Sequence, residues 1–304
     1  MRPELDMTID EFLHYCKNIK NFSKHTISSY GHDLKLFADY IDSYALIFGE
    51  LRFEDARRFV AQLKRDSYEE SSMNRIISGI KSFYRYCLRF DILEENPFSL
   101  VKSMKSMRKL PSVLTVDEVS NFIHAPGYDV IGMRDRVIFR VLYSTGCRLS
   151  ELLAMNIPDL DLHQKRVVVH GKGDKDRFVF LSENTIKDIK LFIPLREQYL
   201  TSRGLVEAVG RPLFINKQGK QLTPQGVHYI FHTYAKKIGI DKHVTPHTFR
   251  HTFATHLLDH DAGIRVVQEL LGHENISTTQ IYSHVSVKRL KDVYIDTHPH
   301  GRRK

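Results

Sequence analysis

The first hundred residues place apolar side chains at the spacing of α-helices. In the stretch "KHTISSYGHDLKLFADYI" (24–41), apolar residues recur at steps of three and four. This is the period of one buried helix face. The stretch "SSMNRIISGIKSFYRYCLRF" (71–90) repeats the spacing, with its apolar residues again on one side. The pattern therefore predicts that this part of the chain is mostly helical.

After residue 113 the pattern changes to helices around one β-rich region. "TVDEVSNFI" is typical of a helix start capped by Thr115, with Glu118 three residues on, and "RDRVIFRVLYSTG" predicts a helix that ends at Gly146. "KRVVVHGKGDKDRFVFL" holds two β-rich runs around a glycine-containing turn, which indicates a hairpin. From about residue 183 the spacing is helical again. The predicted fold class is mainly α with a small antiparallel sheet (α+β), with helices dominant.

A proline-flanked basic stretch separates these two patterns. Pro97 and Pro111 enclose a segment with little apolar periodicity, as expected for a connection between domains. We therefore expect a helical domain at 1–105, a basic linker at 106–112 and a second domain at 113–304.

Basic residues exceed acidic ones along the chain. Lys plus Arg number 45 and Asp plus Glu 36, which gives a net charge of +9 and a pI of about 9.3. This favours a polyanionic partner, most simply nucleic acid, although a merely basic enzyme is the alternative. A single-sign stripe on the second helical stretch and the basic linker region are the candidate phosphate contacts, because a solvated helix face usually mixes charges. These candidates are Arg75, Lys81, Arg85, Arg89, Lys102, Lys105, Arg108 and Lys109.

Other classes of protein fit the sequence less well. It has no run of eighteen apolar residues, so we expect no membrane span. Acidic residues occupy the N-terminal stretch "MRPELDMTIDEF", where an export signal would be apolar. The three cysteines, Cys16, Cys87 and Cys147, are far apart and form no C-x-x-C pair, which argues against a disulfide framework or a thiolate metal site. A cytoplasmic protein is the expectation.

The stretch "TPHTFRHTFATHLL" combines a helix start with polar side chains that could bind an oxyanion. Thr245 is a good N-cap and Pro246 a good first helical residue. His247 and Arg250, three residues apart, share one face near this helix start, where the helix dipole adds positive potential. An exposed polar face is the alternative. A zinc site at His247 and His251 would need the H-E-x-x-H pattern, and this chain has threonine in place of the glutamate.

Other candidate positions are ordinary when each is taken alone. Arg148 follows a glycine turn, and Glu151 lies three residues on, a common helical pair. Lys172 lies between two glycines of the predicted hairpin turn. His273 follows a helix that ends at Gly272, and Tyr282 lies in a short helical stretch where a tyrosine is usually packed in a core.

Together and in chain order, these motifs resemble the tyrosine recombinase (phage integrase) family. The order is an arginine in "TGCRLSELL", a lysine in "GKGDKDR", His-x-x-Arg in "HTFRHTFATHLL", and a histidine and a tyrosine in "LLGHENISTTQIYSH". The N-terminal half is similar to the SAM-like core-binding domain of the family, and the tail "VKRLKDVYIDTHPHGRRK" resembles the Xer-type recombinases. The departures, Cys147 in place of an aliphatic residue and Phe180 in place of proline, touch no catalytic position.

The resemblance implies a site-specific recombinase that cleaves and rejoins DNA through a 3′-phosphotyrosyl intermediate, with Tyr282 as nucleophile. The catalytic residues would be Arg148, Lys172, His247, Arg250, His273 and Tyr282, with Glu151 and His251 in support. The resemblance implies no metal, no ATP and no other cofactor.

It also implies partners. These are a double-stranded recombination site, a tetramer on DNA made of this chain alone or with a second recombinase, and in Xer systems a cell-division DNA translocase. The expected role is resolution of chromosome or plasmid dimers at the nucleoid. The alternatives are the integrase or transposase of a mobile element, a monomeric type IB topoisomerase, and a DNA-binding protein without catalysis.

Overall fold

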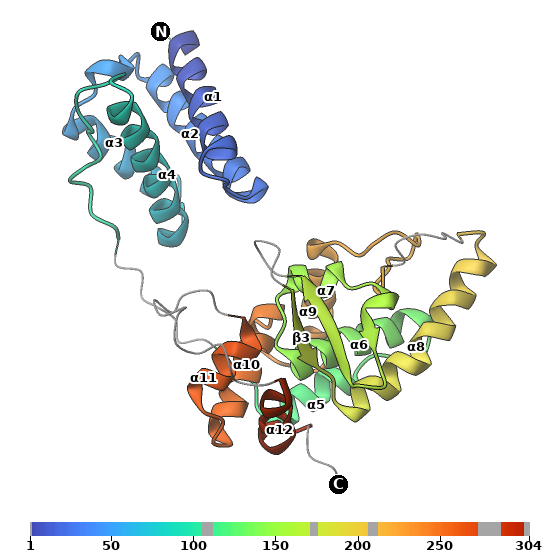
Figure 1. Cartoon of the computed structure of the whole chain (residues 1–304). Helices are drawn as coiled ribbons and strands as arrows, with labels where there is room; N and C mark the ends of the chain where they lie inside the picture. Colours follow the sequence, from blue (N-terminus) through green and yellow to red (C-terminus); the bar gives the residue numbers. More distant parts are fainter. Residues whose placement is uncertain (1, 105–111, 171–175, 206–211, 273–286, 301–304) are drawn as a thin grey trace. The chain divides into compact units, whose positions relative to one another are not determined.

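The computed structural model describes residues 2–104, 112–170, 176–205, 212–272 and 287–300. The chain divides into two compact units, Met1–Lys109 and Leu110–Lys304 (Figure 1). In the part of the chain described, no helix has the length and apolar character needed to span a bilayer.

The first unit is a helical bundle, as the apolar spacing predicted. Its helices are α1 (Arg2–Asn18), α2 (Lys24–Ser43), α3 (Phe53–Arg65) and α4 (Glu70–Arg89), with a 3₁₀ turn at Phe48–Glu50. Helix α2 starts where the Ser23 side chain accepts the backbone N–H of Thr26, which satisfies one of the free donors at a helix start. Phe37 of α2, Phe59 of α3 and Phe83 of α4 are each at most 1% exposed, so aromatic side chains from different helices form one core.

The second unit combines helices with a small antiparallel sheet. Its strands are β1 (Leu160–Asp161), β2 (Arg166–His170) and β3 (Asp176–Phe180), in the order β1-β2-β3. Its helices are α5 (Val116–His124), α6 (Val130–Thr145), α7 (Leu149–Ala154), α8 (Glu183–Ser202), α9 (Pro224–Lys237), α10 (Pro246–Asp259), α11 (Ile264–Leu271) and α12 (Val287–Thr297), with a 3₁₀ turn at Ile157–Asp159. The predicted hairpin is confirmed, because Val168 of β2 pairs with Phe178 of β3 in antiparallel register.

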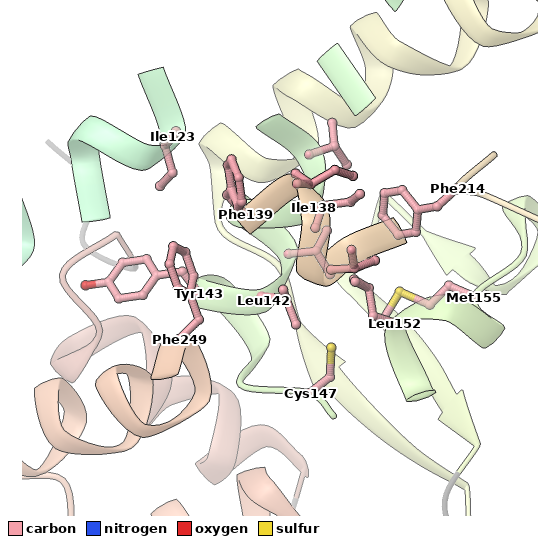
Figure 2. Close-up of a cluster of buried hydrophobic side chains, with 14 of the residues drawn as sticks. Ile123, Ile138, Phe139, Leu142, Tyr143, Cys147, Leu152, Met155, Phe214 and Phe249 are labelled. Atoms are coloured by element: carbon pink, nitrogen blue, oxygen red, sulfur yellow. The ribbon is translucent and has the colours of Figure 1, made fainter. Parts of the chain in front are cut away.

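Helix α6 is the centre of the second unit. It packs against α5, α8 and α10, and its apolar side chains fill the cluster drawn in Figure 2. Phe139 of α6 and Phe249 of α10 are both fully buried, with ring centroids 5.8 Å apart. This packing holds the first turns of α10 beside the C-terminal end of α6, where the candidate site lies.

Local capping signals in the sequence are confirmed at the helices that border the site. Thr245 accepts the backbone N–H of Thr248, and Pro246 is the first residue of α10. Gly146 ends α6 and Gly272 ends α11, with φ angles of 60° and 65°. This left-handed conformation costs glycine nothing, and it turns the chain sharply at both points.

Candidate active site

Arg148 and Glu151 form the first part of the site, at the start of α7. The carboxylate of Glu151 accepts two hydrogen bonds from Arg148, one from the backbone N–H at 2.7 Å and one from the side-chain Nη1 at 3.0 Å. Glu151 is 3% exposed, whereas the side chain of Arg148 is 42% exposed. The predicted pair is therefore more than a surface ion pair, because a buried carboxylate fixes one edge of an accessible guanidinium.

Arg177 of β3 is a residue of the site that the sequence did not point to. Its Nη1 and Nη2 atoms donate to the two oxygens of Glu151 at 2.7 Å and 2.9 Å. Burial alone would raise the pKa of Glu151, but the hydrogen bonds from Arg177 and Arg148 outweigh it and hold the pKa below its ordinary value. The carboxylate therefore stays charged at neutral pH.

Arg250 enters the site from the first turns of α10. It is 7% exposed, so the alternative of an exposed polar face does not hold for this side chain. Its Nη1 donates to the carbonyl of Gly146 at 2.6 Å and its Nη2 to that of Leu271 at 2.8 Å. Burial, followed by the positive charges of Arg148 and Arg177, lowers the pKa of Arg250 to about 10, which still leaves the guanidinium charged at neutral pH.

The two arginines converge on the C-terminal end of α11. Arg148 Nη2 donates to the carbonyl of Gly272 at 3.0 Å, one residue beyond the Leu271 carbonyl that Arg250 binds. Arg148 and Arg177 both bind the carboxylate of Glu151, and Arg250 lies close enough to feel the charges of all three groups. A concentration of fixed positive charge with multiple N–H donors is suited to holding a phosphate and to stabilising charge that develops on it.

His247 and His251 lie together on the accessible side of α10. Their Nε2 atoms are 3.1 Å apart, so one ring donates a hydrogen bond and the other accepts it. Partial burial of the ring, and then the charges of His251 and Arg250, lower the pKa of His247. A neutral imidazole beside the guanidinium can accept a proton at neutral pH.

Three predicted site residues, Lys172, His273 and Tyr282, lie outside the described residues. The elements next to them are described. His170 of β2 pairs with Asp176 of β3, and Lys172 lies between these two residues in the sequence. Gly272, at the end of α11, directly precedes His273.

All four predicted DNA-contact cations on α4 have partners within the first unit. Arg85 donates to the hydroxyl of Ser82 and Arg89 to that of Tyr15. Lys81 donates to the carbonyl of Val101 at 2.6 Å, and Arg75 forms an ion pair with the buried carboxylate of Asp33. Lys81 therefore anchors the segment that follows α4, a use that helical spacing alone did not indicate.

Apart from Arg75 and Lys81, three of the predicted cations lie among the described residues. Arg85 and Arg89 are exposed, on the same side of α4, and Lys102 is exposed beyond it. Lys105, Arg108 and Lys109 lie outside the described residues.

Within the described ranges, no three histidine, cysteine or acidic side chains come together in a way that could hold a metal ion.

Comparisons with known proteins agree on one family. Residues 112–289 match the phage integrase family, and residues 9–90 match the phage integrase N-terminal SAM-like domain. Among curated relatives, tyrosine recombinase XerC of Treponema denticola is 37% identical, with 98% of this chain and 100% of the relative covered. XerC of Halalkalibacterium halodurans is 38% identical and XerD of Oceanobacillus iheyensis 35% identical, each over at least 97% of this chain and 99% of the relative.

Solved structures agree on the fold. The Tn1549 transposon integrase in complex with circular intermediate DNA matches with a TM-score of 0.66 at 19% identity, covering 94% of this chain and 98% of that one. The XerH recombinase bound to its difH substrate matches with a TM-score of 0.65 at 23% identity, covering 93% and 82%.

The chain therefore belongs to the phage integrase family, whose members are the tyrosine recombinases that cleave and rejoin DNA through a bond to a tyrosine. The fold class predicted from the sequence and the family resemblance are both confirmed.

Proposed function

We propose that this protein is an Xer-type site-specific recombinase in which Tyr282 attacks a DNA phosphodiester. The observation that carries the proposal is the convergence of Arg148 and Arg250 on the carbonyls of Gly272 and Leu271. The segment that follows Gly272 holds both His273 and Tyr282. The two arginines therefore bind the chain directly before the segment that contains the nucleophile.

The attack forms a bond between the Tyr282 oxygen and phosphorus, and it breaks the bond from phosphorus to the 5′-oxygen. A tyrosine hydroxyl has an ordinary pKa of about 10 and is a weak nucleophile unless its proton is removed. His247 accepts this proton, and Lys172 donates one to the departing 5′-oxygen, which leaves as a hydroxyl. The products are a 3′-phosphotyrosyl bond and a free 5′-hydroxyl end.

The arginines stabilise the negative charge that accumulates on the non-bridging oxygens. A guanidinium has five N–H donors, more than the two that Arg148 and Arg250 each use in their contacts with protein oxygens. His273 adds a hydrogen bond to the phosphate, Glu151 fixes Arg148, and His251 supports His247. These groups supply the positive charge of the reaction without a metal ion.

Rejoining needs no ATP, because the phosphotyrosyl bond conserves the energy of the phosphodiester. The 5′-hydroxyl of a second strand attacks this bond and releases Tyr282, so cleavage and ligation are nearly balanced in free energy. Strand exchange in this form requires two duplexes and therefore a DNA-bound tetramer, made of this chain alone or with a second recombinase.

The domains divide the work of DNA binding. Residues 1–105 and residues 113–304 each contact the recombination site, and the basic residues of the linker at 106–112 add phosphate contacts. Phosphate contacts supply affinity and base contacts select the site. The XerC and XerD names of the relatives favour resolution of chromosome or plasmid dimers in the cytoplasm, at the nucleoid and with a cell-division DNA translocase as activator, over integration of a mobile element.

A nicked suicide substrate tests the chemistry. The nick lets the short cleaved strand diffuse away, so the covalent protein–DNA adduct accumulates and survives SDS. We expect the adduct to form in EDTA, to disappear in Tyr282→Phe, and to persist in Tyr294→Phe, the control for a tyrosine of the C-terminal helix. An adduct in Tyr282→Phe would overturn the choice of nucleophile, and loss of the wild-type adduct in EDTA would overturn the metal-free mechanism.

A second experiment tests the role in the cell. Covalent adducts trapped in vivo with the wild-type protein are purified and their DNA is sequenced. A single chromosomal locus, or one site on each multimeric plasmid, supports dimer resolution. Adducts at the two ends of a mobile element would instead assign the protein to integration.

A further inference from the structure

We propose that Arg177 is a positioning residue for DNA cleavage, acting through Glu151 to hold Arg148 in its phosphate-binding orientation. The inference rests on the function proposed above. It assigns to β3 a part in the reaction that belongs neither to the nucleophile nor to the residues that would touch the phosphate.

The contacts of Arg177 define this role. Both terminal nitrogens donate to Glu151, one to each oxygen, and the side chain of Arg177 is 17% exposed. Such a two-pronged pair fixes the plane of a carboxylate as well as its position. The same carboxylate accepts the backbone N–H and Nη1 of Arg148. The orientation of the Arg148 guanidinium thus depends on a carboxylate that Arg177 holds from the other side.

Burial makes this dependence strong. Glu151 is 3% exposed, and a buried carboxylate is stable as an anion only with hydrogen-bonded partners of opposite charge. Arg148 is the more exposed of its two partners. If Arg177 were lost, Glu151 would depend on Arg148 alone, and protonation of Glu151 would weaken its contact with Nη1 of Arg148 by removing the negative charge.

Arg177 also packs against the end of α11. A Cβ atom placed on Gly272 would lie 2.9 Å from Arg177 Cζ and 3.0 Å from its Nε and Nη1, so the guanidinium rests against the backbone of this glycine. The carbonyl of Gly272 is the second acceptor of Arg148. Arg177 therefore contacts both of the residues, Glu151 and Gly272, that accept hydrogen bonds from the Arg148 side chain.

The orientation of Arg177 argues against a direct phosphate contact. Its Nη1 and Nη2 atoms both point at Glu151, and its Nε is buried, with no hydrogen-bond partner among the described atoms. Arg166 on the neighbouring strand β2 provides a comparison. It forms a single-pronged ion pair with Asp161 and is 33% exposed, so its loss removes an arginine from the sheet without reaching Arg148.

A double-mutant cycle with the suicide substrate tests the coupling. The rate of adduct formation is measured under single-turnover conditions for the wild type, Arg177→Met, Glu151→Gln and the double variant. We expect each single change to slow cleavage by about 10- to 100-fold, the range that a small misplacement of a reacting group produces. Because both changes disturb the same support of Arg148, the double variant should be no slower than the slower single variant. Multiplication of the two effects would overturn the proposal.

The pH dependence of the cleavage rate distinguishes this role from a purely structural one. Removing the Arg177 charge raises the pKa of Glu151, so the loss in Arg177→Met should be largest at pH 6 and shrink toward pH 8. In the Glu151→Gln background this dependence should vanish. A defect of equal size at every pH would contradict the proposal.

Controls separate the possible failures. Arg166→Met should cleave at the wild-type rate. Arg177→Lys keeps the positive charge but not the two-pronged guanidinium. This variant should fold, cleave at an intermediate rate and show a weaker pH dependence than Arg177→Met. Full activity in Arg177→Lys would count against the proposal even if Arg177→Met failed to fold. Absence of the wild-type adduct would instead disprove the proposed function, whereas a wild-type adduct with independent effects would disprove only the role of Arg177.

Discussion

Arg250 Nη2 lies 2.8 Å from the carbonyl oxygen of Leu271, so a side chain of α10 holds the last residue of α11. The same guanidinium holds the Gly146 carbonyl at the end of α6 through Nη1, at 2.6 Å. Arg250 is only 7% exposed, and its two contacts join the ends of two helices. The residue that would bind phosphate is therefore also the residue that sets the geometry of its own surroundings.

We expect Arg250→Lys to lose most of the cleavage activity. A lysine ammonium cannot reproduce the planar fork that reaches two carbonyls and a phosphate together. The rate of adduct formation should fall by about 10²- to 10³-fold, as when one donor to a developing oxyanion is removed, while affinity for the DNA site changes much less. Single-turnover cleavage and gel-shift binding measure the two effects. Arg203→Lys, at the end of α8, is the control, and cleavage within twofold of wild type in Arg250→Lys would contradict this account.

Gly146 is expected to tolerate no side chain. Its φ angle is 60°, and a Cβ atom there would lie 2.4 Å from Cδ1 of Phe253. Left-handed backbone strain costs about 1 kcal/mol, and overpacking adds about 1–3 kcal/mol. Gly146→Ala should therefore lower the free energy of unfolding by about 2–4 kcal/mol, measured by denaturant or thermal unfolding.

Gly204 supplies the matched control for this substitution. Its φ angle is 66°, and no described atom lies within 4 Å of a Cβ placed there. Gly204→Ala should thus cost about 1 kcal/mol from the backbone alone. Equal losses in the two variants would show that contact with Phe253 is not the reason for glycine at position 146.

Features set by neighbours in the sequence were predictable. The cap at Thr245 and Pro246 and the helix ends at Gly146 and Gly272 each depend on a few adjacent residues. The apolar period predicted the buried face of α4, and the β-rich runs predicted the hairpin. The pairing of Arg148 with Glu151 was predictable for the same reason, since the two residues lie three apart.

Features set by tertiary packing were not predictable from one sequence. Arg177 lies 26 residues from Glu151, and nothing in "KDRFVFL" distinguishes it from an ordinary sheet arginine. Lys81 belongs to a cationic helix stripe, yet it binds the carbonyl of Val101, which only the folded chain brings near. The buried acceptors of Arg250 are likewise backbone carbonyls, and backbone atoms carry no sequence signal.

The cations of α4 are expected to divide into two groups by experiment. Arg85 is exposed, and if it contacts a phosphate, Arg85→Ala should reduce the slope of log affinity against log salt by about 0.9 without changing thermal stability. Lys81→Ala removes the hydrogen bond to Val101 and should lower the free energy of unfolding by about 0.5–1.5 kcal/mol. Salt titrations of DNA binding and thermal unfolding separate these outcomes, and an unchanged salt slope in Arg85→Ala would exclude it as a phosphate contact.

The C-terminal helix α12 packs on α10 and α11. His298, directly after α12, packs its ring against Tyr294 of α12 and Phe253 of α10. His298 is fully buried, its Nε2 lies 3.0 Å from the carbonyl of Tyr143, and its Nδ1 accepts the backbone N–H of His300. These contacts require the neutral ring with the proton on Nε2, because protonated Nδ1 would face an N–H group. Burial, followed by the nearby His300, lowers the pKa of His298 to about 3.

Other titratable groups around this helix act in the same direction. Burial, followed by the charges of Arg140 and His124, lowers the pKa of His300 to about 4. Burial also lowers the pKa of His256, whose Nδ1 is hydrogen-bonded to the hydroxyl of Tyr143 at 2.8 Å. The packed form of α12 is therefore the form with neutral histidines.

We expect the packing of α12 to weaken in acid. When α12 detaches, these histidines return to an ordinary pKa of about 6.5. Below this pH the detached form binds more protons than the packed form. The stability of the packed form therefore falls as the pH drops from about 6.5 toward 4. Hydrogen exchange of α12 should be slow at pH 8 and, after correction for intrinsic rates, clearly faster at pH 5. His298→Gln can keep a donor toward Tyr143 and an acceptor for the His300 N–H while removing the titration, so its pH dependence should be weaker by about one proton. Equal protection of α12 at both pH values in the wild type would show that these histidines do not control the packing of the C-terminal helix.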